Sequence, residues 1–180
     1  MRSAAIVAQS ILLAVLYGVA HDLVTAHVCV EYFTVGHPPV FRTDSPVLLA
    51  MGWGVIATWW VGAMLGIPLA LAARVGRWPK LSSRDMWGPL TRLLAVMGTL
   101  AALSGLVGYT LARRGSIWLI GGLADAVPRE HHAGFLADWW AHSASYVVGF
   151  TGGVVLIVLT VLRRRRLARL SIQNAPEPDL

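Results

Sequence analysis

The chain has 180 residues, of which 56% are hydrophobic and 13% charged, and its mean hydropathy is +0.63. This composition is too apolar for an ordinary soluble domain. The net charge of +6 would suit a nucleic-acid-binding protein, but the basic residues gather at the ends of apolar segments, so we expect no nucleic-acid partner.

Four apolar stretches are each long enough to cross a bilayer, which takes about 20 helical residues. We therefore predict an all-α fold, an integral membrane four-helix bundle, in a single domain over residues 1–170. The spans are expected at residues 4–34, 46–74, 90–113 and 128–164. The first and last helices should extend beyond the outer face. The polar tail, residues 171–180, is predicted to be disordered and cytoplasmic.

The first apolar stretch allows two interpretations. Arg2, a short apolar region and the small residues around Ala20 could form a cleaved secretory signal. Cleavage there would make His21 the N-terminus, whose amine and imidazole could hold copper. The apolar pattern instead continues past Val24, which favours an uncleaved helix ending before Pro38. Such a helix would be some 45 Å long and would exceed the hydrocarbon thickness.

The second and third spans are predicted to be scaffold, because neither carries a histidine or an acidic residue. Gly62 and Gly66 have the GxxxG spacing that allows close helix packing, and it could also serve a homo- or hetero-oligomer. Pro68 predicts a kink near the inner side. Gly98 is one of several small residues expected to pack tightly in the third span.

The distribution of Lys and Arg predicts the orientation. Basic residues cluster in the second connection and in the run 163–166 after the last span. Because such clusters stay in the cytoplasm, both termini should face it, in the cell inner (plasma) membrane. The first and third connections would then lie on the periplasmic or exterior side.

All six histidines fall in two stretches that this topology places at the outer side: His21, His27 and His37 in the first, His131, His132 and His142 in the second. Counting about 20 residues outward from the basic ends brings the first and last helices to the same level near His21 and His142. Carboxylates accompany the histidines at helical spacing, as in the Asp138–His142 and His27–Glu31 pairs.

Imidazoles and carboxylates together suit a divalent transition metal, with Zn, Fe, Mn and Cu all open. The predicted metal ligands are His21, His27, Glu31, His131, Asp138 and His142. A histidine could instead lie outside the ligand set, where Asp22 or Asp138 would orient it. The protein would then be a redox or hydrolytic metalloprotein acting on a lipid, a quinone or a small molecule. No motif selects a reaction or a catalytic residue.

Two other functions fit the same residues. His21 and His142 could be the axial ligands of a haem b held between neighbouring helices. Alternatively, the protein is a non-enzymatic membrane subunit or carrier with a titratable outer vestibule. His37 beside Pro38 suits a turn, and Cys29 suits a small packed residue rather than a ligand.

Overall fold

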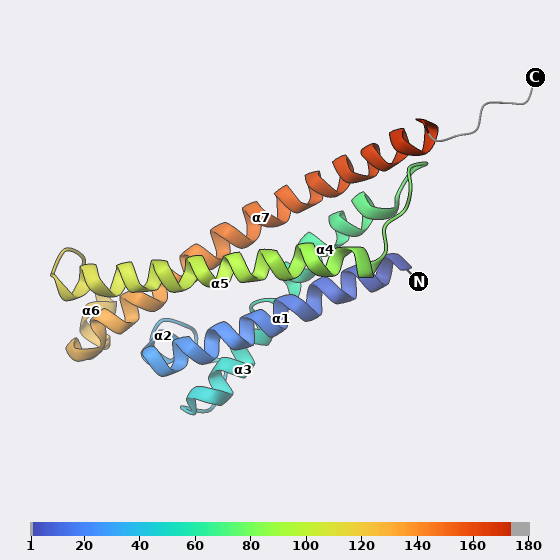
Figure 1. Cartoon of the computed structure of the whole chain (residues 1–180). Coiled ribbons are helices and arrows are strands. Elements are labelled where there is room, and N and C mark those ends of the chain that lie inside the picture. The colour runs from blue at the N-terminus through green and yellow to red at the C-terminus, as the bar shows by residue number, and fades with distance from the viewer. Residues whose placement is uncertain (1, 174–180) are drawn as a thin grey trace, which may run out of the picture.

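The computed structural model describes residues 2–173, and these residues form helices joined by turns and loops, with no strand (Figure 1). The elements in chain order are α1 (Arg2–Val28), α2 (Glu31–Thr34), α3 (Pro46–Ile56), α4 (Trp59–Arg74), α5 (Ser83–Arg113), α6 (Gly122–Ala126), the 3-10 turn η1 (Arg129–His131) and α7 (His132–Gln173). Four segments are long and apolar enough to cross a membrane: Ser3–Val28, Pro46–Arg74, Ser83–Arg113 and Arg129–Gln173.

Two of these helical paths are interrupted where the sequence predicted continuity. The first helix ends at Val28, and the chain turns at Cys29 and Val30 before α2. The second path breaks at Ala57 and Thr58, whereas Pro68 lies inside the unbroken α4. The Thr58 hydroxyl donates to the Gly54 carbonyl oxygen, and such a bond from a side chain competes with the regular helical pattern.

The other two long helices are longer than predicted. Helix α5 begins at Ser83, because Ser82 and Asp85 form a capping box that bonds the first turn reciprocally. Helix α7 continues to Gln173, so residues 171–173 of the predicted disordered tail are helical. Residues 174–180 lie outside the described range.

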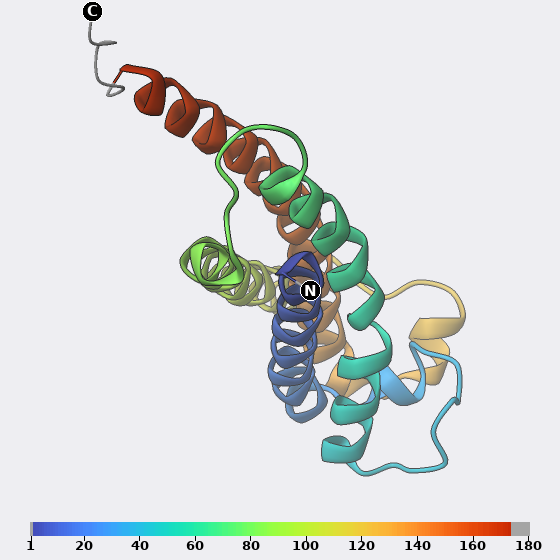
Figure 2. The same ribbon diagram turned by 90° about the vertical axis from the view of Figure 1, so that its right-hand side faces the viewer.

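The helices associate as two close pairs. Helix α1 packs along α3 and α4, and α5 packs along α7, whereas α1 and α7 touch only sparsely. Glycines make both seams possible: a Cβ on Gly62 would lie 2.7 Å from the Ile11 Cα, and one on Gly108 would lie 2.7 Å from the Trp140 Cγ. Seen from the N-terminal end, α1 lies between α5 and the α3–α4 path (Figure 2). The sparse contact between α1 and α7 leaves room for a cavity between the pairs.

Both ends of the described chain lie at the same end of the molecule, together with the connection between α4 and α5 (Figure 1). We call this the terminal end. The opposite, distal end carries α2, α6, η1 and the loop that leads to α3. Each end has its own core, with Phe33 and Phe135 buried in the distal core and Ile6 and Met86 in the terminal one.

One arginine of the basic run is part of the terminal core. Arg164 is 2% exposed, and its guanidinium donates hydrogen bonds to the backbone at the end of α4 and in the loop that follows. The acceptors are the carbonyl oxygens of Ala72, Val75, Trp78 and Pro79, at 2.6 to 3.0 Å. These carbonyls include groups that a helix end leaves without an internal partner. Arg164 thereby ties α7 to the end of α4.

Candidate metal centre

A buried group of titratable side chains from the two helix pairs lies in the distal half of the structure. His21 and Asp22 come from the continuous part of α1, and His142 comes from α7. One ligand atom from each of these three residues lies within 4.8 Å of the other two. Among residues 2–173 this is the only such group of three or more His, Cys, Asp or Glu side chains. Asp22 and His142 are buried, and His21 is partly buried.

The hydrogen bonds of His142 define which ring nitrogen is free. Its Nδ1 lies 2.9 Å from the Asp138 carbonyl oxygen, one helical turn back on α7. Because a carbonyl oxygen only accepts, Nδ1 carries the proton and donates it. The Nε2 atom then presents its lone pair to the Asp22 Oδ1 at 3.2 Å. Two acceptors face each other at this position unless a proton or a metal cation lies between them.

His21 completes the group from the same turn of α1 as Asp22. Its Nε2 lies 3.4 Å from the His142 Nδ1, and the two rings meet edge to face with their centroids 4.4 Å apart. On its other side the His21 ring stacks against Tyr17 at 5.7 Å. The Tyr17 hydroxyl is in turn hydrogen-bonded to the Ser145 hydroxyl at 2.7 Å, which links α1 to α7 beside the group.

Tyr32 of α2 covers the group from the distal side. Its buried ring stacks on His142 with centroids 4.4 Å apart and lies 5.6 Å from the Phe135 ring. Aromatic rings packed in this way restrict the rotation of the imidazole. The turn at Cys29 and Val30 makes this possible, because it folds the short α2 toward α7.

Asp138 adds a second buried carboxylate next to the group. It is 4% exposed, and its Oδ2 has no hydrogen-bond partner among the described residues. Asp22 is close enough for the two carboxylates to repel each other. A buried carboxyl group without a partner is costly in its charged form, and either a proton or a nearby cation offsets that cost. The surroundings of His142 could therefore hold a cation.

Two of the predicted ligands, Glu31 and His131, form a separate pair nearer the surface. The His131 Nδ1 lies 2.8 Å from the Glu31 Oε1, and the Cys29 thiol donates to the Glu31 Oε2 at 3.2 Å. Burial raises the pKa of Glu31, but hydrogen bonds from its own backbone, His131 and Cys29 outweigh that effect and hold it below its ordinary value. Burial and the bond to Glu31 raise the pKa of Cys29 to about 12.

The structure does not bring His27 to the group either. This side chain is exposed, and its Nδ1 donates to the Leu23 carbonyl oxygen at 2.7 Å. His37 and His132 likewise bond to backbone carbonyl oxygens, those of Tyr32 at 2.7 Å and of Val127 at 2.9 Å. Each of these three imidazoles already has one nitrogen engaged in local structure.

Of the six predicted ligands, the structure places His21 and His142 in the group and Asp138 beside it. Asp22 is the member that the predicted ligand set omitted, although the sequence contains a signal for it. It follows His21 directly and lies at the same depth on the helix. Comparisons of the chain with protein-family models, with curated proteins and with solved structures give no match.

Proposed function

We propose that the chain is an integral membrane metalloprotein whose ligands are His21, Asp22 and His142. Membrane insertion is supported by the four apolar segments and by large hydrophobic side chains on the outside of the helices, such as Leu16, Leu106 and Val147. Lipid would cover these side chains in a membrane. The basic terminal end would face the cytoplasm, so the metal centre would lie toward the periplasmic or exterior side.

The observation that carries the proposal is the 3.2 Å approach of the His142 Nε2 to the Asp22 Oδ1. Ligand atoms held about 2.0 to 2.2 Å from a tetrahedral ion lie roughly 3.4 Å apart. The bond from His142 Nδ1 to the Asp138 carbonyl is the kind that fixes the tautomer of a ligating histidine. Both the spacing and the tautomer therefore suit a metal ligand.

The composition of the group favours an ion with free coordination positions. Two imidazoles and one carboxylate are typical of catalytic zinc and of non-haem Fe(II). Such sites leave positions for water, dioxygen or a substrate. Zinc would supply hydrolytic chemistry and iron would supply redox chemistry. Asp138, with its free buried oxygen, is well placed to accept a proton in either case.

The contact between the His21 and His142 rings disfavours a haem between them. Axial ligands occupy opposite faces of the macrocycle. Here the two imidazole rings touch edge to face, with centroids 4.4 Å apart, so no porphyrin fits between them. A single ion bound beside both rings agrees better with this contact.

Metal analysis of the detergent-purified protein tests the proposal. We expect about one equivalent of zinc or iron in the wild type and in His27→Ala, and a large loss in His142→Ala. His27→Ala is the matched control because His27 lies on α1, the helix of His21 and Asp22, but is exposed and outside the group. If the wild type contains no stoichiometric metal, the metal centre is excluded and the non-enzymatic function remains. A Soret band would instead show that the protein binds haem.

A further inference from the structure

A cavity of about 320 Å³ extends from the metal centre toward the terminal end, between the two helix pairs. Its volume is within the range of about 300 to 1,000 Å³ found for small-molecule sites. It reaches from His21 to Ser10 along α1, and this separation of eleven residue steps corresponds to roughly 17 Å of helix. A cavity of this volume and this length is narrow, so its shape suits an extended occupant.

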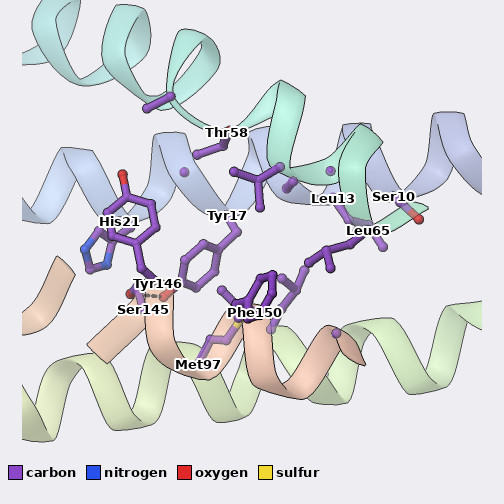
Figure 3. A pocket seen from close by; sticks show the side chains of 18 of the residues that line it. Ser10, Leu13, Tyr17, His21, Thr58, Leu65, Met97, Ser145, Tyr146 and Phe150 are labelled. Carbon is purple, nitrogen blue, oxygen red and sulfur yellow. Dashed lines mark hydrogen bonds between the residues drawn. The ribbon is translucent and has the colours of Figure 1, made fainter. Parts of the chain in front are cut away.

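The two ends of the cavity differ in chemistry. Near the metal centre lie His21, the hydrogen-bonded Tyr17 and Ser145, and Tyr146 (Figure 3). Toward the other end the wall is aliphatic, with side chains that include Leu13, Leu65, Leu69, Leu90 and Leu94. The cavity is therefore polar at one end and apolar along the rest, as an amphiphile requires.

On α4 and α7 the cavity is lined by side chains that also reach the outside of the helices. Four of its lining residues are about half exposed: Trp60, Met64, Tyr146 and Phe150, at 48%, 44%, 52% and 54%. Within each helix the two residues are four positions apart, so they lie on one face. Both faces line the cavity and are half exposed, which indicates a lateral opening between α4 and α7. Because it lies within the apolar part of the chain, the opening would face the acyl chains of a bilayer.

From the polar end, the aliphatic wall and the lateral opening, we propose that the cavity binds a single-chain amphiphile that enters from the membrane. Its carbonyl- or hydroxyl-bearing head would lie beside His21 and Tyr17, and its chain would extend toward Ser10. The claim that the head is the substrate of the metal centre rests on the proposed function. The claim that the cavity binds the hydrocarbon chain of the amphiphile stands independently of it.

Two sources offer this chemistry, an isoprenoid quinone and a monoacyl lipid, and one experiment distinguishes them. The purified protein in lipid nanodiscs is photolabelled with a long-chain fatty alcohol that carries a diazirine, and the labelled positions are mapped by mass spectrometry. We expect labels on the cavity side of α4 and α7. Competition by decylubiquinone would identify a quinone site, and competition by lysophosphatidylcholine would identify a lipid site.

Obstruction of the cavity provides the matched comparison. Leu94→Trp on α5 and Ala57→Leu at the break before α4 fill it from opposite walls, and both should lose most of the competable labelling. Leu103→Trp makes the same change as Leu94→Trp on the same helix, at a side chain that is 54% exposed and outside the cavity, and should retain the labelling. Equal labelling of all three variants, or labels spread evenly over the lipid-facing surface, would overturn the proposal.

The metal content of the same variants separates the two proposals. Leu94→Trp should lose the competable labelling and keep its metal, whereas wild-type protein stripped of metal by a chelator should keep the labelling. If no wild-type preparation contains metal but cavity labelling persists, the amphiphile site stands and the metal centre fails. If the metal is present but cavity labelling is absent, the amphiphile site fails.

Discussion

The Nε2 atom of His142 lies 3.2 Å from the Oδ1 of Asp22, and the two side chains are buried although 120 positions separate them in the chain. Since the other ring nitrogen of His142 donates to the Asp138 carbonyl, this contact joins two acceptors unless a proton or a metal cation lies between them. The fold thus holds a lone pair and a carboxylate against each other in a buried place. A proton or a metal cation at that position resolves the conflict, and the second of these is the metal centre that we propose.

Asp22→Asn tests this relationship with almost no change in shape. The amide nitrogen of the new side chain can donate to the His142 Nε2, so the metal-free protein should remain as stable as the wild type or become more so. Metal binding should weaken at least tenfold, because the variant loses a charged ligand (outer-sphere changes alone typically cost about 10- to 100-fold). Competition with a chromophoric chelator measures the affinity, and unchanged affinity would remove Asp22 from the site.

The approach of the first and last helices near His21 and His142 could be predicted from the sequence, but the full ligand set could not. Counting along the spans from the basic ends puts His21 and His142 at the same depth, and the structure brings these residues into contact. His27 is six residues after His21, which corresponds to about 240° around a helix at 100° per residue, so it points elsewhere. A count of depth alone does not contain that rotation.

The position of Glu31 depends on a break that no residue type announces. The break falls at Cys29 and Val30, and neither is a residue that usually ends a helix, as glycine and proline do. The helix nevertheless ends there, and α2 turns toward α7. The turn is stabilised by packing, since Tyr32 and Phe33 become buried against residues from distant parts of the chain. Such tertiary packing overrides local propensity, and a single sequence does not reveal it.

Cys29 is the single cysteine in the chain and serves as a built-in probe of this turn. It is 3% exposed, and burial together with the bond to Glu31 raises its pKa to about 12. A raised pKa means less thiolate at any given pH, so iodoacetamide should react slowly with the folded protein up to about pH 10. In denaturant the thiol should titrate near its usual pKa of about 8.5.

Glu31→Gln should move the alkylation profile of the folded protein to lower pH. The change removes a negative charge that disfavours the thiolate of Cys29 and leaves burial as the main cause of the raised pKa. Alkylation rates followed by mass spectrometry over a pH series measure the shift. Rapid alkylation of the folded wild type near neutral pH would show that the thiol is not held as the structure describes.

The run of four arginines offers a comparison between identical residues. Arg164 is buried and bonds to four carbonyl oxygens, whereas Arg166 is exposed. Arg164→Ala should destabilise the protein by at least about 3 kcal/mol, because it leaves several buried acceptors without donors. Arg166→Ala should change the stability by less than about 0.5 kcal/mol. Chemical unfolding in mixed micelles measures both, and equal effects would contradict the assigned role of Arg164.

The glycines of the apolar helices are of two kinds: some lie against the backbone of a neighbouring helix, and others have room for a methyl group. A Cβ on Gly62 would lie 2.7 Å from the Ile11 Cα and 2.9 Å from the Ser10 carbonyl oxygen, so α1 and α4 would have to move apart. A Cβ on Gly98 would meet the Tyr17 ring at 3.7 Å, an ordinary contact. The sequence pattern alone predicts tight packing at both positions.

We therefore expect opposite signs for the two changes. Gly62→Ala should destabilise the protein by about 1 to 3 kcal/mol through overpacking against backbone atoms. Gly98→Ala should stabilise it by about 0.5 to 1 kcal/mol, because glycine within a helix costs that much relative to alanine. Thermal unfolding midpoints measured in one detergent compare the variants directly. A neutral Gly62→Ala would mean that the seam between α1 and α4 is packed differently from the structure, and a destabilised Gly98→Ala would mean that α5 lies closer to Tyr17 of α1 than the structure describes.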